Sequence, residues 1–495
     1  MILCMTFNMV RINWNEPKFG DEEIKEVTEV LNAGYVNEGP KTKQLEEELK
    51  KYLGVKHVLL TTNATAALFL AIKADAIIRN KEDFEVIVPD LTMIATATSV
   101  EWAGGKPVLV DVEKERATID ISKIEEKINE KTIAIIPVHI LGRSADMNEL
   151  MNFASKHNLT VIEDAAGALG SKDQSGKYLG TIGKMGIFSL QSNKIITSGQ
   201  GGIIVTDDDK YYEALRRLRD FGRFSNKEFI HEKVGYNLKF NDLSAALALA
   251  QFRKIESKKQ MLSNQRALYQ NALKDIREVK FPAYNSEEIP LWIEIIANNR
   301  TALVEFLIKN EISARECWPA VHINPPYKNQ GNDSDFPNSS FLSKNILWLP
   351  NGSAITSEQI NYISEKIKEF YNSGLNMKKI HEDNRGYIYL ISNLLENNKE
   401  FTFLETKTGY ARGGCLHPRD EYLVIVKGRI KLLLGDEEKV LSMGESIKIP
   451  ANKTHAWVAL EDSITAEWGV TEEEKKGRDL ELRKIIDQIN EANKK

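Results

Sequence analysis

Apolar runs of strand length alternate with segments of helical periodicity from residue 20 to about residue 260. This alternation is typical of a parallel sheet covered by helices on both faces, and it predicts an α/β fold. In one predicted helix, Leu45 and Leu49 fall on the same face, while Thr42 can cap the start and Gly54 can end the helix. Such a sheet binds ligands at the carboxyl ends of its strands. The predicted strands are Val86–Val88, Val108–Val112, Ile133–Val138, Thr160–Glu163, Gly186–Leu190 and Ile203–Thr206.

The length of 495 residues predicts two or three domains rather than a single core. The alternating pattern defines a large α/β domain over residues 1–260. Residues 261–372 change to a mixture of helical segments and strand-like runs such as LWIEII, which predicts a smaller α+β domain. Near this boundary and beyond it, we expect a long polar helix from about Leu243 into the 270s, and helices at Ala302–Lys309 and Thr356–Tyr371.

A third domain is expected over residues 377–495, where short β runs separated by turn residues predict a small barrel or sandwich. The Lys/Glu-rich tail from about Thr471 carries apolar residues at helical spacing, so we expect a helix that packs on the barrel or on a partner subunit. A polar linker precedes this domain and contains Asn372, Ser373, Gly374 and Asn376. The predicted strands are Ile388–Ile391, Phe401–Glu405, Tyr422–Val426, Ile430–Leu434 and Ala456–Leu460.

The charge balance argues against nucleic acid as a partner, because 66 basic and 71 acidic residues leave no basic excess to neutralise a phosphate backbone. Cys4, Cys317 and Cys415 are odd in number and lack CxxC spacing, which favours a reducing, cytosolic compartment. The opening MILCMTFNMV lacks a basic region and is far shorter than the roughly 20 residues of a membrane helix. We therefore expect no membrane partner.

The first of three chemical motifs is TTNATAAL, residues 61–68, which follows the strand-like VKHVLL and opens an apolar helix. Small residues at such a turn expose unpaired backbone N–H groups at a helix N-terminus, where the helix dipole favours an anion. The segment is therefore a candidate phosphate cradle. A helix that is merely N-capped is the alternative.

The second motif, TVIEDAAGALG, ends an apolar strand with Glu163 and Asp164. A carboxylate at the carboxyl edge of the sheet can keep the pyridine nitrogen of pyridoxal phosphate (PLP) protonated, which preserves the ring as an electron sink. Asp164 suits that task. A helix cap or a solvated edge is the alternative for this acidic pair.

The third motif, GIFSLQSNKIITSGQGG, is a strand followed by Lys194 and a glycine-rich turn. A partly desolvated lysine, or one beside other cations, has a lowered pKa, so its free amine can form a Schiff base. The glycines would let the backbone pass close to a cofactor. A lysine without this context would be read as a surface charge.

In this order the motifs resemble those of the StrS/DegT-type sugar-nucleotide aminotransferases, a PLP-dependent family of fold type I. The similarity covers roughly residues 10–372 and includes NATAAL, PVHILG, EDAAGALG, FSLQSNKIITSGQGG and GYNLK. The resemblance implies a mostly parallel sheet with helices on both faces, joined to the small α+β domain. A dehydratase branch of the family has histidine at the position of Lys194, so the lysine favours transamination.

The resemblance also implies roles for single residues. Lys194 would bind PLP covalently and act as general acid and base, and Asp164 would pair with the pyridinium. Asn237 would reach the phosphate from a neighbouring subunit, which implies a homodimer with shared sites. Met93 would cover the ring where the family commonly has an aromatic residue, and core packing is the alternative. The residues expected to contact the phosphate are Ala64, Thr65 and Ser189.

Four further residues are candidates for the substrate side of the site. His139 would lie near the cofactor, although a hydrogen-bonded core histidine is the alternative. Arg315 and His322 match the family segment RxxWxxxH, and Lys239 replaces the arginine of GYNxR. The two cations could bind the diphosphate of a nucleotide sugar or a carboxylate of the amino donor, because such anions need paired donors. Ordinary surface placement is the alternative.

The third domain resembles the two cupin motifs between Gly409 and Ala459. Cys415 takes the place of the first motif histidine, and the resemblance implies that the polar residues point into an all-β barrel. There they could bind a divalent ion such as Zn, Fe or Mn. RGGCLH is also similar to a motif of metal-free cupin ketoisomerases, and a barrel that only binds sugar or stabilises the oligomer is the bland alternative. The candidate metal ligands are Cys415, His417, Glu421 and His455.

The sequence thus predicts transfer of an amino group, with glutamate as the expected donor, to the 3- or 4-keto group of a nucleoside-diphosphate keto-deoxy sugar. Such a reaction serves amino-sugar and polysaccharide biosynthesis. A bifunctional enzyme, in which the cupin isomerises or epimerises the sugar before transamination, is the first alternative. A non-catalytic protein that binds PLP or sugar is the second.

Overall fold

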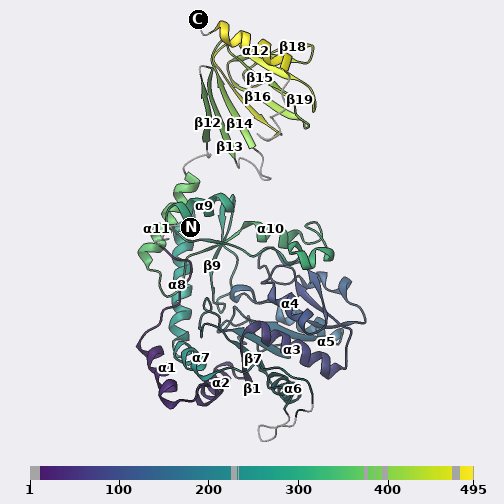
Figure 1. Ribbon diagram of the computed structural model, residues 1–495, viewed down its shortest axis with the longest axis vertical. Helices are drawn as coiled ribbons and strands as arrows, with labels where there is room; N and C mark the ends of the chain where they lie inside the picture. Colours follow the sequence, from purple (N-terminus) through teal and green to yellow (C-terminus); the bar gives the residue numbers. More distant parts are fainter. Residues whose placement is uncertain are drawn as a thin grey trace, which may run out of the picture. The chain divides into compact units, whose positions relative to one another are not determined.

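The computed structural model describes residues 12–223, 231, 233–372, 377–383, 385–392, 400–470 and 480–493. The chain divides into two compact units, Met1–Phe370 and Tyr371–Lys495 (Figure 1). The predicted linker residues Ser373, Gly374 and Asn376 lie outside the described residues, whereas Asn372 ends a helix. No helix in the described part of the chain is both long and apolar enough to cross a membrane.

The first unit contains the alternating helices and strands that the sequence predicts. Its helices are α1 (Asp21–Ala33), α2 (Pro40–Leu53), α3 (Ala64–Arg79), α4 (Ala95–Trp102), α5 (Met147–Lys156), α6 (Asp209–Arg219), α7 (Asp242–Phe252), α8 (Ile255–Leu273), α9 (Arg300–Lys309), α10 (Pro337–Asn345) and α11 (Ser357–Asn372). Its strands are β1 (His57–Thr61), β2 (Glu85–Pro89), β3 (Lys106–Val110), β4 (Thr132–Ile135), β5 (Thr160–Asp164), β6 (Met185–Ser189), β7 (Gly202–Thr206), β8 (Val279–Lys280), β9 (Ile293–Ala297), β10 (Arg315–Glu316) and β11 (Ile346–Leu349).

The large sheet has the strand order β1-β7-β6-β5-β4-β2-β3. Strands β2 to β6 are parallel, while β7 runs antiparallel to both of its neighbours, β1 and β6. The ends of β1, β5 and β6 therefore meet the start of β7 at one edge of the sheet. This mixed but mostly parallel sheet confirms the predicted α/β fold class.

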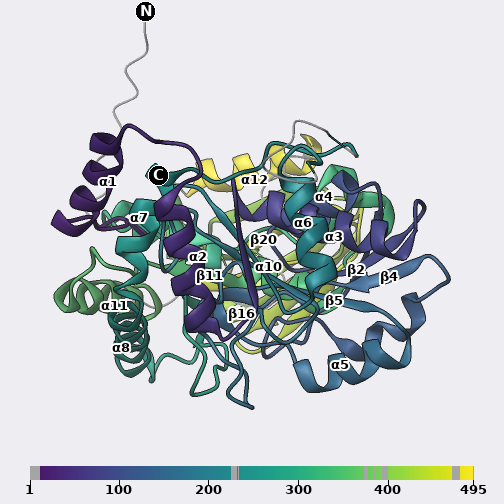
Figure 2. The ribbon, with the colours of Figure 1, turned by 90° about the horizontal axis from the view of Figure 1, so that it is seen from below.

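Helices cover both faces of this sheet (Figures 1 and 2). In β7, Ile203 and Val205 pack into one apolar cluster with residues of α2, α7 and α8, while Ile204 packs into a second cluster with residues of α3 and α6. This alternation follows from the two-residue period of a strand, whose successive side chains point to opposite faces. Because both faces are buried, the strands carry the continuous apolar runs seen in the sequence.

The smaller sheet of this unit has the order β10-β11-β9-β8. The prediction of one long helix from about Leu243 into the 270s is wrong, because α7 ends at Phe252 and α8 begins at Ile255. The two helices differ in how much of their surface is buried. Most residues of α7 are buried, whereas α8 is a polar helix with buried residues only at spaced positions, and a turn at Arg253 and Lys254 separates the two helices.

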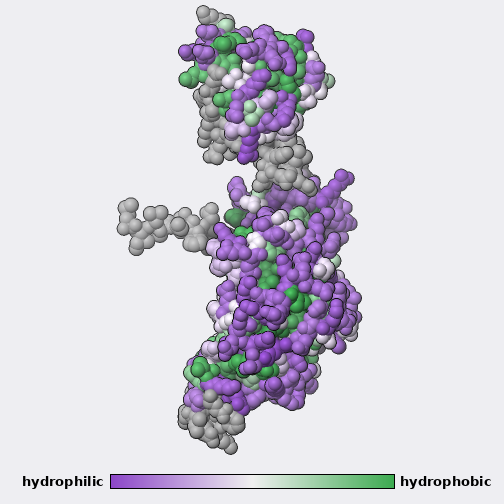
Figure 3. Space-filling model, turned by 90° about the vertical axis from the view of Figure 1, so that its right-hand side faces the viewer, coloured by the Kyte–Doolittle hydropathy of each residue, from purple (hydrophilic) through white to green (hydrophobic). Residues whose placement is uncertain are grey.

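The outer surface is largely hydrophilic on the face shown, with smaller hydrophobic patches (Figure 3).

The second unit is the predicted all-β domain with a terminal helix. Its sheets have the orders β12-β13-β14-β21-β16-β19 and β15-β20-β17-β18. The helix α12 (Leu480–Ala492) buries Ile486 against Ala411 and Ala456, so it packs on the second sheet. The strands are β12 (Met377–Asp383), β13 (Gly386–Ser392), β14 (Glu400–Thr406), β15 (Ala411–Cys415), β16 (Glu421–Lys427), β17 (Arg429–Leu434), β18 (Glu437–Ser442), β19 (Ser446–Ile449), β20 (His455–Ala459) and β21 (Ser463–Trp468).

Candidate active site

The carboxyl edge of the large sheet brings the three chemical motifs together. Gly202, the first residue of β7, pairs with Thr61 at the end of β1 and with Ser189 at the end of β6. A Cβ atom at Gly202 would lie 2.4 Å from the carbonyl oxygen of Asn63. Only glycine therefore lets β7 pass this close to the turn that opens α3. The glycine-rich sequence after Lys194 thus has a steric cause at this position.

The start of α3 has the features of a phosphate cradle. Asn63 caps the helix, and its side-chain oxygen accepts a hydrogen bond of 2.8 Å from the N–H of Ala66. The N–H groups of Ala64 and Thr65, in the first turn, have no acceptor within the helix by its geometry. Ser189, whose strand is joined to β1 through β7, ends on the same edge. Two backbone donors that α3 itself leaves unpaired, a helix dipole and a hydroxyl at one edge fit a phosphate group.

Asp164 ends β5 and is buried at this edge. Its Oδ2 accepts a hydrogen bond of 2.8 Å from the Thr96 hydroxyl, and its Oδ1 accepts one of 3.2 Å from the N–H of Ala166. Burial raises the pKa of the Asp164 carboxyl, while these hydrogen bonds and the charge of Lys194 oppose the rise. A carboxylate has about four acceptor positions, so Asp164 keeps capacity for a donor such as a pyridinium N–H.

The preceding carboxylate, Glu163, is committed to the fold. It accepts hydrogen bonds from the N–H groups of Gly180, Ile182 and Gly183, and one carboxylate oxygen lies 2.8 Å from Nε2 of His139. Nδ1 of His139 accepts the N–H of Ala145 at 3.3 Å, so its Nε2 carries the proton and donates to Glu163. These contacts correspond to the core-histidine alternative, and a contact between His139 and the cofactor stays a prediction.

Lys194 lies five residues beyond the end of β6, in a segment without helix or strand. Its Nζ lies 5.3 Å from the centroid of the Trp292 ring. Desolvation lowers the pKa of the Lys194 amine to about 8, and attraction by Asp164 opposes this shift. Because the neutral amine is the nucleophile, the environment of Lys194 fits covalent binding of an aldehyde.

Met93 follows β2 and is 47% exposed. It lies three residues before Thr96, whose backbone N–H donates to the Met93 carbonyl at 3.1 Å and whose hydroxyl donates to Asp164. The structure therefore brings Met93 to the same edge as Asp164. Sequence reasoning missed Thr96, although it lies in the same VPDLTMIAT segment that singled out Met93.

The GYNLK segment runs beside the phosphate cradle. Lys239 forms a β-bridge with Thr61, and Asn237 is exposed. The ammonium of Lys239 donates to Asp220 at 2.6 Å and lies 4.6 Å from the centroid of the Phe221 ring. The segment is thus at the predicted edge, but within one chain Lys239 already has a carboxylate partner.

Arg315 and His322 have different surroundings. The exposed Arg315 lies in β10, and its guanidinium is 4.6 Å from the centroid of a Trp14 ring. His322 is buried, with Nδ1 2.7 Å from Asp90 and Nε2 3.0 Å from Asp333. Since each ring nitrogen faces a carboxylate, His322 links Asp90, in the loop after β2, to Asp333. A contact between His322 and a substrate stays a prediction.

Three polar residues form a buried cluster in the second unit. Nε2 of His417 lies 3.1 Å from Oε2 of Glu421, and Nε2 of His455 lies 3.0 Å from the same oxygen. Nδ1 of His417 lies 2.9 Å from the carbonyl oxygen of Arg419, which leaves Nε2 as the metal-facing nitrogen. The ligand atoms of the cluster lie within 4.8 Å of one another, which suits a divalent cation.

Cys415 does not belong to this cluster. It pairs with His455 across β15 and β20, and the pairing register shifts between Gly413 and Cys415. Residues that pair directly point to the same face of a regular sheet, but a bulge re-aims the side chain. The two histidines and Glu421 therefore lie together without Cys415, and a role of Cys415 as a metal ligand stays a prediction.

The two units match two known families of domains. Residues 17–368 match the DegT/DnrJ/EryC1/StrS aminotransferase family, and residues 409–471 match the cupin domain. The GDP-perosamine synthase of Escherichia coli O157:H7 is 32% identical over 364 residues, which cover 72% of this chain and 98% of that relative.

Two solved aminotransferase structures share the fold. PseC of Helicobacter pylori, an aminotransferase involved in the biosynthesis of pseudoaminic acid, superimposes with a TM-score of 0.69 and 26% identity, covering 73% of this chain and 99% of PseC. DesV of S. venezuelae gives a TM-score of 0.67 and 27% identity, covering 71% and 94%. These similarities confirm the fold-type-I architecture predicted for the first unit.

Proposed function

Because the chain belongs to the DegT/DnrJ/EryC1/StrS aminotransferase family, we propose that it transfers an amino group from glutamate to the 3- or 4-keto group of a nucleoside-diphosphate keto-deoxy sugar. The product would serve amino-sugar or polysaccharide biosynthesis. The observations that support this proposal are the electrostatic interaction between the buried Lys194 amine and the buried Asp164 carboxylate, and the strand ends that bring Asp164, Ser189 and the start of α3 to one edge of the sheet.

The family implies PLP, and the residues at this edge fit it. The N–H groups of Ala64 and Thr65 and the hydroxyl of Ser189 would hold its phosphate. Asp164 would bind the pyridine nitrogen, Lys194 would hold the aldehyde carbon, and Met93 would cover one face of the ring. When bound, PLP supplies an electron sink that stabilises negative charge on the carbon next to the transferred nitrogen.

The chain's own residues supply proton transfer and charge. With a pKa lowered to about 8, the Lys194 amine can accept and return a proton near neutral pH, as a general acid and base requires. The Thr96 hydroxyl donates to Asp164 and stabilises the ionised carboxylate, which in turn would favour a protonated pyridine nitrogen. Lys194 and Asp164 thus have complementary tasks.

Substrate recognition would come from the cations and from a second subunit. Arg315 is exposed and carries a charge that suits a diphosphate or a donor carboxylate. Lys239 could bind the same anion if its ammonium left Asp220. His139 and His322 would contribute by holding the loops that carry their hydrogen-bond partners. Asn237 is exposed, and we propose that it reaches the cofactor phosphate of a neighbouring subunit, so that a homodimer has shared sites. Neither Cys317 nor Cys415 forms a disulfide among the described residues, which fits the proposed cytosolic location.

The test combines cofactor attachment with product analysis. The purified protein should be yellow, and borohydride should fix the cofactor to the peptide that contains Lys194. A panel of 3- and 4-keto-sugar nucleotides, supplied with glutamate and analysed by mass spectrometry, should yield one amino sugar. Yellow colour and activity that persist in Lys194→Ala would overturn the proposal.

A second activity is favoured by the cluster of His417, Glu421 and His455. We propose that this cluster binds a divalent metal and, as a separate proposal, that the cupin isomerises or epimerises the keto sugar before transamination. Its test uses the full chain: Glu421→Gln should block conversion of the unisomerised sugar, while the pre-isomerised sugar is still aminated. Equal use of both sugars by this variant would leave the cupin without a catalytic step.

A further inference from the structure

The segment that carries Lys194 has no regular secondary structure, so its conformation depends on tertiary contacts. Within the segment there are two backbone hydrogen bonds: the Ser198 N–H donates to the Leu190 carbonyl at 3.1 Å, and the Lys194 N–H donates to the Gln191 carbonyl at 3.0 Å. The carbonyl groups on either side of Lys194, those of Asn193 and Ile195, are held by side chains from outside the segment.

On one side, Nε1 of Trp292 donates a hydrogen bond of 3.0 Å to the carbonyl oxygen of Asn193. Trp292 is buried and directly precedes β9, and its ring also faces the ammonium of Lys194. The same side chain therefore fixes the preceding peptide and contacts the lysine itself.

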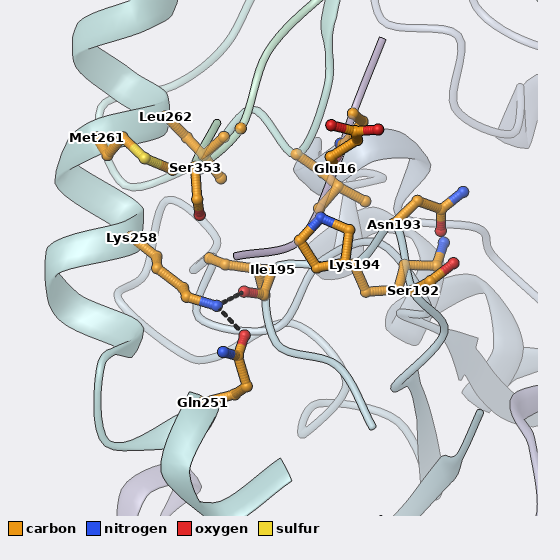
Figure 4. A pocket seen from close by; sticks show the side chains of 14 residues that line it. Glu16, Ser192, Asn193, Lys194, Ile195, Gln251, Lys258, Met261, Leu262 and Ser353 are labelled. Carbon is orange, nitrogen blue, oxygen red and sulfur yellow. Dashed lines mark hydrogen bonds between the residues drawn. The ribbon is translucent and has the colours of Figure 1, made fainter. Parts of the chain in front are cut away.

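On the other side, Nζ of Lys258 donates a hydrogen bond of 3.0 Å to the carbonyl oxygen of Ile195. Lys258 lies in the first turn of α8, and Figure 4 shows its side chain reaching across a pocket toward the Lys194 segment. Nζ also donates to Gln251 of α7, whose amide in turn donates to Glu23 at 2.7 Å. Gln251 is 1% exposed, so this chain of hydrogen bonds anchors Lys258 to the core.

Burial of the Lys258 ammonium costs desolvation free energy, which indicates that this side chain has a role at this position. Burial lowers the pKa of Lys258 to about 8, and attraction by Glu23 opposes this shift. An apolar side chain would fill the same space without the desolvation penalty. The pocket is lined by both lysines, and it leaves the Lys194 segment incompletely packed on this side. A long cationic side chain that spans the pocket supplies the missing support.

We propose that Lys258 is a positioning residue for Lys194, which holds the peptide after Lys194 while Trp292 holds the peptide before it. Together they would keep the amine beside the Trp292 ring and within the electrostatic reach of Asp164. The inference rests on the proposed function for the task of Lys194, but it concerns how this chain places that amine before any substrate arrives.

The experiment measures how fast cofactor-free protein couples with PLP, with borohydride quenching and peptide mass spectrometry to count PLP on Lys194. Lys258→Met should slow coupling by about tenfold, the ratio expected for loss of one hydrogen bond to a charged group. Lys258→Arg, which keeps a cationic donor, should recover most of the rate. Lys259→Met is the matched control, because Lys259 is the next residue of α8 and bonds to Glu256 instead.

Thermal unfolding of the cofactor-free variants shows whether each one folds. If Lys258→Met does not fold, Trp292→Phe takes over the test, because it removes the donor to Asn193 and keeps a ring, and it should slow coupling about threefold to tenfold. Failure of wild-type protein to couple with PLP would refute the proposed function. Normal coupling in the wild type together with wild-type rates in the folded Lys258→Met or Trp292→Phe protein would overturn the positioning inference alone.

Discussion

The two units each bury a set of titratable side chains, and they hold these sets in different ways. At the sheet edge, no ion pair joins Lys194 to Asp164 within the described ranges, and burial shifts the pKa of both groups toward the neutral form. In the cupin, Glu421 lies within hydrogen-bonding distance of His417 and His455. A separated amine and carboxylate keep their capacity for a ligand with two polar ends, whereas a closed cluster suits one small cation.

The Lys194 amine, which is separated from Asp164, should have the largest effect on activity. Lys194→Ala should lower transamination by about 10⁴-fold, because it removes both the group that binds the cofactor and the general acid and base. Steady-state rates with glutamate and a keto-sugar nucleotide measure this loss. Lys259→Met provides the control for a lost lysine elsewhere and should keep the wild-type rate.

The carboxylate should have a smaller effect than the amine. Asp164→Asn keeps the shape of the side chain and one acceptor oxygen, so it can keep the hydrogen bond from Thr96 but not also the one from the Ala166 N–H, and it removes the charge that would stabilise a protonated ring nitrogen. We expect a rate lowered by about 10²-fold to 10³-fold, with PLP still attached to Lys194. An unchanged rate would show that the site works without a charged partner for the ring.

In the cluster of His417, Glu421 and His455, a substitution should change the amount of bound metal. Glu421→Gln should weaken binding of Zn²⁺, Mn²⁺ or Fe²⁺ by at least about 100-fold, since even partners outside the ligand shell contribute about 10-fold to 100-fold. Metal analysis after dialysis of the full chain measures this loss, and the rate of transamination of the pre-isomerised sugar should stay within about twofold. Glu437→Gln, at an exposed carboxylate of the same unit, should retain the metal.

The smallest expected effect is a shift in titration. In cofactor-free protein, acylation of Lys194 should follow a pKa of about 8, since burial disfavours the charged amine, and should return to about 10.4 after unfolding. Asp164→Asn removes the attraction that opposes this shift, so the pKa of Lys194 should fall further. Competitive labelling at several pH values, read by peptide mass spectrometry, gives both numbers, and a rise in the variant would contradict the electrostatic account.

Sequence periodicity predicted most of the large sheet, because its strands are buried on both faces and their apolar runs are continuous. The predicted strand Ile203–Thr206 corresponds to β7, and the predicted strand Gly186–Leu190 to β6. Periodicity failed between α7 and α8. The apolar pattern of the sequence continues through the turn at Arg253, since Phe252 and Ile255 are both buried, so the pattern does not reveal where α7 ends.

The site could be predicted in outline, since Asp164 and the α3 turn directly follow strands that end at the same edge. Local sequence could not show that Glu163 is consumed by three backbone N–H groups and His139. It gave no signal for Lys258 or Trp292, whose partners in the Lys194 segment lie more than 60 residues away in the chain. These contacts link distant elements, and no periodicity records them.

The sequence by itself determined the family, the fold class and the order in which phosphate turn, carboxylate and lysine occur. It could do so because each motif is a local unit, a strand followed by a turn whose geometry depends on neighbouring residues. Only the tertiary structure decided that His322 is held between two aspartates, that Cys415 is left out of the cupin cluster, and which side chains support Lys194. Hydrogen-bond partners and burial depend on what packs against a residue, and packing is a property of the whole fold.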